Sequence, residues 1–330
     1  MGTFPNEESS GGMFVLTNVE MPRSELPFVI HEDVVLRAAS AQEIALLEEG
    51  LENTYGAFCS RRCEPTMKYK GHLITNNDGH LTLTDEGYEG EARFWVVAYH
   101  GVNDHAEALE WAGLLTEPQL VLGFTYICFK PEQQECTGCI IGNRMPVGRF
   151  RSDLFETAKT ISLSELKRFR DLYLQIKVDC TAPERATELL GRYIQTVSFH
   201  KADEVLVLLY TGIIESILTH KPDPKDPTDS LGRQVSAKMN LVRNRFELDI
   251  KPESYFTKNQ GQLGEFNKIW KNLYSVRSAI IHGDHVSFES GQYAKFDSIE
   301  IINKYLHDNI RELIKLYFAE PVLLRDLKEC

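Results

Sequence analysis

Residues 263–283 read LGEFNKIWKNLYSVRSAIIHG and predict a helix that stops at a glycine. Gly283 suits the left-handed backbone conformation that ends many helices. Arg277 and His282 lie just before it, and residues with their spacing sit about 140° apart around a regular helix axis. They can face one small site only if the helix ends there. The carbonyls of the last turn also favour a protonated imidazole. The stretch therefore indicates a helix end that carries chemistry.

Three more helical patterns accompany this stretch and favour an antiparallel bundle with short connections. In the first of them, over residues 183–220, apolar residues recur at three- and four-residue steps. The proline-rich loop 222–227 must end that helix, because proline removes a helical hydrogen-bond donor. Ser230 is the candidate cap of the second helix, and either Asp297 or Ser298 caps the third. The three patterns cover residues 183–220, 230–246 and 298–320.

The N-terminal part has a different character. Short runs rich in β-branched and aromatic residues, separated by Gly, Asn and Asp, predict strands within 16–38 and 80–130. Helical spacing occurs in between, and a further helix is expected over 162–177. The expected fold class is α+β, with an all-α C-terminal bundle preceded by a mixed, β-leaning domain. The expected regions are a disordered leader (1–12), a mixed domain with a hypothetical sensor or regulatory role (13–150), a helical connector (151–194) and the helical domain (195–330).

Charge is distributed unevenly along the chain. The formal net charge is −12, yet residues 231–282 carry nine basic and four acidic side chains, a local charge of +5. A polyanion such as RNA can bind there, with Arg243, Arg245 and Lys271 as the candidate contacts. Charge alone is equally compatible with side chains that merely solvate helix surfaces.

Several classes of protein are disfavoured. No window approaches the ~18 to 20 uninterrupted apolar residues that a membrane span requires. Residues 1–12 lack the basic and apolar regions of a signal peptide. Seven cysteines in a chain of this size favour a reducing compartment over a disulfide-stabilised secreted protein. We therefore expect a cytoplasmic protein that does not contact a membrane.

Two pairs of cysteines have the spacing of metal ligands. Cys136 and Cys139 form a CxxC pattern typical of a zinc knuckle, and Cys59 and Cys63 form a second pair. Four thiolates are the soft tetrahedral set that zinc prefers. The other interpretation is a set of isolated thiols, so structural zinc is a hypothesis with an open alternative.

Three features of the C-terminal part coincide in one protein family. Arg277 and His282 form an R-x4-H signature with the polar Ser278 after the arginine, and LYSVRS precedes the final IHG. Upstream, LLYTGIIESILT resembles the family's glutamate-bearing helix and puts Glu215 in the matching place. On these features residues 195–320 resemble the HEPN superfamily, and more closely the Apea-like HEPN family.

The resemblance implies a four-helix bundle with the activity of a metal-independent endoribonuclease that needs no cofactor. In such enzymes the RNA 2′-hydroxyl attacks the adjacent phosphodiester and leaves a cyclic phosphate and a 5′-hydroxyl. His282 is then expected to move protons near neutral pH, and Arg277 to stabilise charge on the phosphoryl oxygens. The family also implies a homodimer whose two motifs line one cleft, with a role in bacterial anti-phage or toxin-type defence.

Neighbouring residues are weaker candidates. Glu215 is expected to hold Arg277 in register or to order His282, with a surface carboxylate as the alternative. Ser278 is a candidate phosphate donor and His285 a second proton-transfer group, each with an ordinary surface residue as the alternative. The alternative function for the chain is a catalytically inactive HEPN sensor that binds a nucleotide or RNA. A third is a toxin-like effector held inactive by a regulatory or antitoxin partner.

Overall fold

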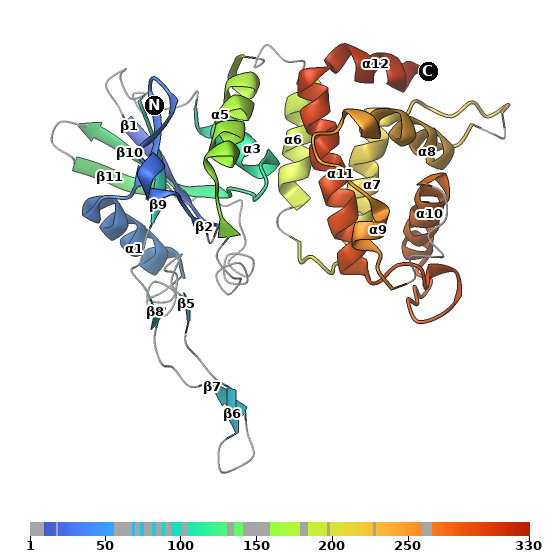
Figure 1. The fold of residues 1–330 in the computed structure, drawn as a ribbon, viewed down its shortest axis with the longest axis horizontal. Coiled ribbons are helices and arrows are strands. Elements are labelled where there is room, and N and C mark those ends of the chain that lie inside the picture. Colours follow the sequence, from blue (N-terminus) through green and yellow to red (C-terminus); the bar gives the residue numbers. More distant parts are fainter. Residues whose placement is uncertain are drawn as a thin grey trace. The chain divides into compact units, whose positions relative to one another are not determined.

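The computed structural model of this protein describes residues 10–17, 19–55, 68–69, 73–75, 81–83, 88–89, 94–100, 105–130, 135–140, 159–178, 184–196, 199–226, 229–258 and 266–330. The chain folds into two compact units, Met1–Cys180 and Thr181–Cys330. The first holds an antiparallel sheet with helices and the second holds helices, so the predicted α+β class is confirmed (Figure 1). The expected connector 151–194 spans the boundary between the units.

The sheet of the first unit has six strands in the order β11-β10-β1-β9-β4-β3, with all neighbours antiparallel. Its centre is apolar, because Leu36, Val96 and Val97 are fully buried. These strands are β1 (Ser10–Val15), β3 (Phe28–His31), β4 (Val34–Ala38), β9 (Trp95–His100), β10 (Leu122–Lys130) and β11 (Glu135–Ile140). The short strands are β2 (Val19–Glu20), β5 (Lys68–Tyr69), β6 (Leu73–Thr75), β7 (Leu81–Leu83), β8 (Tyr88–Glu89) and β12 (Lys159–Thr160). The helices are α1 (Ala41–Tyr55), α3 (Ala106–Leu115) and α5 (Leu163–Val178).

The expected disordered leader extends too far into the chain, because β1 begins at Ser10 and lies in the middle of the sheet. Gly11 and Gly12 belong to this strand. An added Cβ at Gly11 would come within 2.8 Å of the Tyr99 ring, and one at Gly12 would collide with the Tyr126 side chain. These glycines resemble a flexible linker in the sequence, but here they permit a close approach of the strand to two aromatic rings.

Glu43 ties helix α1 to two strands of the sheet. Its side chain is buried and accepts hydrogen bonds from the Arg37 guanidinium, the Ser40 backbone N–H and the Tyr126 hydroxyl. Burial by itself would raise the pKa of this carboxyl, but the three hydrogen bonds outweigh burial and lower the pKa to about 2. The carboxylate therefore stays charged at neutral pH and fixes the start of α1.

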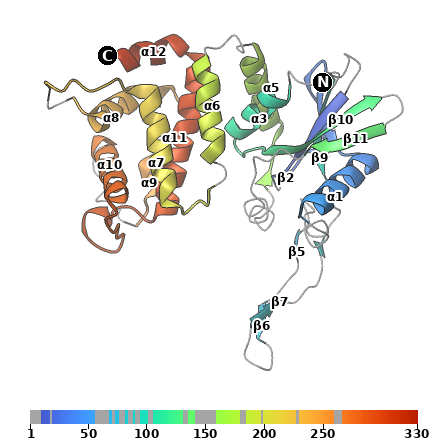
Figure 2. The same ribbon diagram turned by 180° about the vertical axis from the view of Figure 1, so that it is seen from behind.

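Helix α7 (Glu204–Leu218) lies at the centre of the second unit. It contacts α6, α8, α10, α11 and α12, because its sequence EVLVLLYTGIIESIL is apolar on most sides (Figure 2). The other helices are α6 (Glu184–Thr196), α8 (Leu231–Val242), α9 (Pro252–Tyr255), α10 (Phe266–His282), α11 (Ile299–Ala319) and α12 (Pro321–Glu329). Among the helices that the structure describes in either unit, none is both long and apolar enough to cross a membrane.

The helix expected over 183–220 is in fact two helices, α6 and α7. Asp203 caps the second by accepting a hydrogen bond from the Val205 N–H at 3.0 Å. The amide of Asn303, buried on α11, donates to the backbone carbonyls of Lys201 and Asp203, each at 2.9 Å. A side chain from a distant helix therefore fixes the break, which the local apolar pattern does not reveal.

The start of α11 distinguishes between the two candidate caps. The Ser298 hydroxyl accepts a hydrogen bond from the Ile301 N–H at 3.3 Å, so Ser298 is the cap. Asp297 instead accepts hydrogen bonds from the backbone N–H groups of Thr257 and Lys258, at 3.1 and 3.0 Å. It thereby holds the segment that follows α9 against the start of α11.

A buried carboxylate joins three helices of the second unit. Asp308 of α11 accepts hydrogen bonds from the Tyr255 hydroxyl of α9 at 2.7 Å and from the Lys304 ammonium at 3.2 Å. Its other oxygen lies 3.2 Å from Nδ1 of His307, whose Nε2 hydrogen-bonds the Tyr193 hydroxyl of α6 at 2.8 Å. Burial would raise the pKa of Asp308, but His307, Tyr255 and Lys304 outweigh burial and hold the pKa well below its usual range.

Candidate functional site

Helix α10, which carries the R-x4-H motif, ends where the sequence predicts. Its last residue is His282, and Gly283 has a φ of 72°. The Gly283 N–H bonds the Ile280 carbonyl at 3.2 Å, and the Asp284 N–H bonds the Ala279 carbonyl at 2.9 Å. These two hydrogen bonds form a Schellman motif. The prediction that Gly283 ends the helix in a left-handed conformation is therefore confirmed.

Gly283→Ala is expected to lower the free energy of unfolding by about 1 to 2 kcal/mol, the cost of left-handed backbone for a residue with a Cβ. Nothing lies within 4 Å of the added Cβ, so the strain is confined to the backbone. Gly191 in α6 is a matched control, since its added Cβ also meets nothing within 4 Å. There alanine is expected to stabilise by roughly 0.5 to 1 kcal/mol. Urea unfolding measures both changes, and effects of the same sign would contradict the assignment.

Arg277 is anchored by α7. Its Nη2 lies 3.4 Å from Oε2 of Glu215, and the Tyr274 hydroxyl donates to Oε1 of the same carboxylate at 3.0 Å. The Arg277 guanidinium also lies 5.8 Å from the centre of the Tyr274 ring. Burial, reinforced by the charge of Glu215, raises the pKa of Tyr274, so its hydroxyl stays a donor. Of the two roles expected for Glu215, contact with Arg277 is the one that the structure contains.

His282 lies on a different side of α10 from Arg277. The helix is unbroken through both residues, so the ~140° between their positions persists. The His282 side chain is exposed, and among the described residues no hydrogen bond or ion pair joins it to Arg277 or Glu215. Lys271 and Ser278 are exposed as well, and their helical spacing places them on the His282 face. One chain thus presents histidine and arginine in different directions.

The remaining candidates around the motif have distinct surroundings. His285 is exposed in the segment after the helix. Arg245 is paired with Glu320, since its Nη1 lies 2.8 and 2.7 Å from the two carboxylate oxygens. The Arg243 guanidinium lies 4.4 Å from the centre of the Phe266 ring. Of the three expected RNA contacts, Arg243 and Lys271 therefore have no ion-pair partner in the described parts of the chain, whereas Arg245 has one.

The candidate zinc ligands are described only in part. Cys59 and Cys63 lie outside the described residues. Cys136 and Cys139 belong to strand β11, which pairs with β10, so the CxxC lies in an extended ladder and not in the turn of a zinc knuckle. A separate group within the described part of the chain brings possible ligand atoms within 4.8 Å of one another, on a turn between two strands: His31, Glu32 and Asp33.

Sequence reasoning missed two aromatic residues of this region. Tyr274 shares Glu215 with Arg277, and its signal was available, because residues three apart are neighbours on a helix surface. Phe266 stacks with Arg243, but this contact joins the first turn of α10 to the segment after α8. A contact between separate elements leaves no local pattern in the sequence.

Comparisons of the chain with protein-family models, with curated proteins and with solved structures find no match. The functional proposal therefore depends on the sequence motif together with the geometry of α7 and α10.

Proposed function

We propose that this protein is a metal-independent endoribonuclease of the HEPN type. The observation that carries the proposal is the end of α10, where an exposed His282 stands at a fixed helix stop and Arg277 is oriented by Glu215. In this proposal α7, α8, α10 and α11 are the four helices of the HEPN bundle. The resemblance supplies the setting, which is bacterial anti-phage or toxin-type defence in the cytoplasm.

The proposed reaction forms a bond between the RNA 2′-oxygen and phosphorus and breaks the bond from phosphorus to the 5′-oxygen. His282 takes the proton of the 2′-hydroxyl or delivers one to the leaving 5′-oxygen, because histidine exchanges protons near neutral pH. Arg277 offers two directed N–H donors to the phosphoryl oxygens as their charge develops. Glu215 and Tyr274 are positioning residues, since they touch Arg277 and not the RNA.

The test uses purified protein with total RNA and with a defined oligonucleotide, in the presence of EDTA. The expected products carry a cyclic phosphate at one new end and a 5′-hydroxyl at the other. Cleavage that EDTA abolishes would contradict the metal-independent mechanism. Binding of the oligonucleotide without any cleavage would contradict the ribonuclease proposal itself.

A homodimer is part of this proposal for a geometric reason. Arg277 and His282 occupy positions about 140° apart around α10, so a cleft that takes the arginine of one copy and the histidine of the other would bring both to a single phosphate. We expect that a mixture of Arg277→Ala and His282→Ala chains regains cleavage that neither variant shows alone. In the mixed dimer one cleft keeps both an intact arginine and an intact histidine. A site contained within one chain predicts no recovery on mixing, and the cleavage assay decides between the two.

One observation favours a second function, a nucleotide- or RNA-binding sensor without catalysis. The ion pair with Glu215 partly neutralises the guanidinium that would have to stabilise phosphoryl charge. The two functions differ in cells that express the protein. A ribonuclease arrests growth until His282 is replaced by alanine, whereas for a silent sensor this substitution does not change growth.

A further inference from the structure

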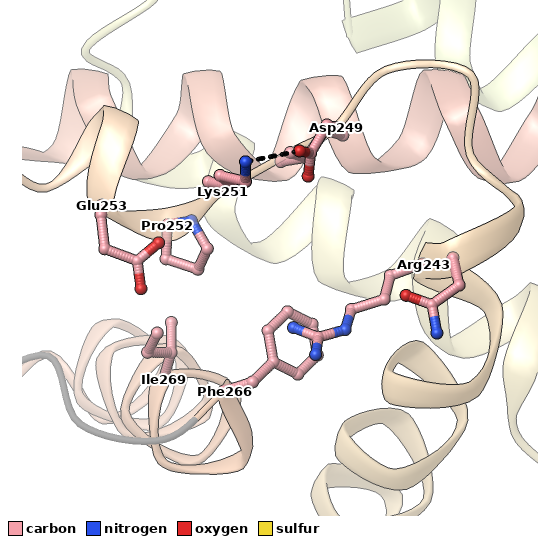
Figure 3. Close-up of a pocket in the computed structure, with 9 residues that line it drawn as sticks. Arg243, Asp249, Lys251, Pro252, Glu253, Phe266 and Ile269 are labelled. Carbon is pink, nitrogen blue, oxygen red and sulfur yellow. Dashed lines mark ion pairs between the residues drawn. The ribbon is translucent and has the colours of Figure 1, made fainter.

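A pocket of about 480 Å³ opens between the segment that follows α8 and the first turn of α10 (Figure 3). This volume lies within the ~300 to 1,000 Å³ typical of small-ligand sites. The pocket mixes a planar cation, an aromatic ring, an amide, a carboxylate and apolar side chains. The residues that supply them include Arg243, Asn244, Pro252, Glu253, Phe266 and Ile269.

The charges in the pocket single out Arg243. Lys251 also lines it, but its ammonium lies 2.7 Å from the Asp249 carboxylate, as the dashed line in Figure 3 marks. Arg243 has no carboxylate at ion-pair distance in the described part of the chain, and its guanidinium lies 4.4 Å from the centre of the Phe266 ring. The pocket lining therefore includes a flat positive group that lies over an aromatic ring of the same pocket.

Bare phosphate fits this pocket poorly, because the carboxylates of Asp249 and Glu253 line it too. A ligand with a flat face and a negative charge fits better. A nucleobase stacks readily on an arginine plane or an aromatic ring, and the edge of a guanidinium binds phosphate. The exposed Asn244 amide lines the same pocket and can then meet the hydrogen-bonding edge of the base.

We propose that this pocket binds one nucleotide, with its base stacked on Arg243. The proposal rests on the ribonuclease function in one respect, which is that RNA is the natural source of the nucleotide. Phe266 and His282 are the two ends of α10, about 24 Å apart at 1.5 Å per residue. The pocket therefore holds a nucleotide distant from the one that is cleaved, and it selects RNA that spans both places.

The test measures equilibrium binding of a short single-stranded RNA and, separately, of 5′-GMP and 5′-AMP. All proteins carry His282→Ala so that RNA is not consumed. Arg243→Ala is expected to weaken binding roughly 5- to 150-fold, the effect of losing one base stack. Arg243→Lys keeps the charge but removes the plane, so a similar loss is expected. Arg192→Ala, which removes the same charge from an exposed arginine of α6 that is paired with Glu188, is expected to change affinity less than twofold.

The outcomes distinguish RNA from free nucleotides as the ligand, and stacking on Arg243 from an effect of net charge. If Arg243→Ala weakens the binding of RNA alone, the pocket binds a nucleotide within a strand. If it weakens the binding of 5′-GMP or 5′-AMP as well, the pocket also binds free nucleotides. Equal weakening by Arg243→Ala and Arg192→Ala would show that only net charge matters and would overturn the proposal. Unchanged binding in every variant would overturn it as well. Thermal unfolding checks that each variant is folded. Cleavage is measured with the protein that keeps His282. Cleavage by that protein together with normal binding by Arg243→Ala refutes only the pocket, whereas Arg243-dependent binding without cleavage refutes only the ribonuclease.

Discussion

Replacing His282 with alanine is expected to reduce RNA cleavage by about 10²- to 10⁴-fold, the usual contribution of a positioned proton-transfer group. Arg277→Ala is expected to cause a loss of at least about 10²-fold, because a preorganised donor to the developing phosphoryl charge disappears. His282 is exposed, whereas the Arg277 side chain is only 28% exposed and pairs with Glu215, so the stability of Arg277→Ala is measured beside its rate. The measurement is the single-turnover cleavage rate of a labelled oligonucleotide.

Matched controls separate these effects from general damage. His200→Ala removes another exposed histidine of the same unit, and Arg233→Ala removes an exposed arginine of α8. Both controls are expected to keep the cleavage rate within about twofold, because surface substitutions away from a site rarely matter. If His282→Ala cleaves as fast as His200→Ala, the proposed site is wrong. Equal thermal unfolding midpoints among the variants show that a loss of rate is not a loss of fold.

Asp308→Ala is expected to lower the free energy of unfolding by about 3 to 5 kcal/mol, the typical effect of removing one partner of a buried charge network. The substitution removes the carboxylate that lies 3.6 Å from Nη1 of the buried Arg311 and that the Tyr255 hydroxyl and His307 share. Lys304 contributes little to this loss, because its side chain is 62% exposed. Asp326→Ala is the control, because Asp326 lies in a pair with Arg325 in which both side chains are about two-thirds exposed. That pair is expected to contribute less than about 1 kcal/mol. Urea unfolding at neutral pH measures both variants.

The Asp308 contribution also has a defined dependence on pH. Its folded pKa lies below the unfolded value of about 3.9, so the charged form stabilises the fold at neutral pH. This stability is complete above the unfolded pKa and disappears as pH falls through the folded pKa. The difference in unfolding free energy between the wild type and Asp308→Ala should therefore shrink below about pH 4. A difference that stays constant down to about pH 3 would exclude this origin.

Local signals predicted local structure well. The glycine at 283 and the serine at 298 end and begin helices through bonds between residues at most five positions apart, so the residue types at these positions already determine the outcome. The break between α6 and α7 depends on Asn303, a residue about a hundred positions further along the chain. The place of Gly11 and Gly12 in the sheet likewise depends on tyrosines of other strands. Such determinants cannot be read from the segment that they shape.

The candidate site also has features that the sequence predicts and features that depend on distant residues. A motif fixes which residues belong together in sequence, and it correctly placed Arg277 beside Glu215 of another helix. It could not show that Arg245 is paired with Glu320, because this ion pair joins η4 (Arg243–Arg245) to the residue between α11 and α12, far along the chain. The stack of Arg243 on Phe266 has the same origin. Charge counts along the sequence therefore overestimate how many cations are free of an ion-pair partner.

The central position of β1 has a consequence for how the chain folds. Its partners lie far along the sequence, since Phe14 pairs with Val96 and Ser10 pairs with Cys128. During synthesis the first strand must wait until β10 has been made before both of its edges are paired. Sheets with such long-range pairing fold slowly, whereas helices that pack on their neighbours in sequence fold fast. The N-terminal unit is therefore the slow-folding part of the molecule, and an unpaired β1 edge is where a newly made chain is most exposed to aggregation.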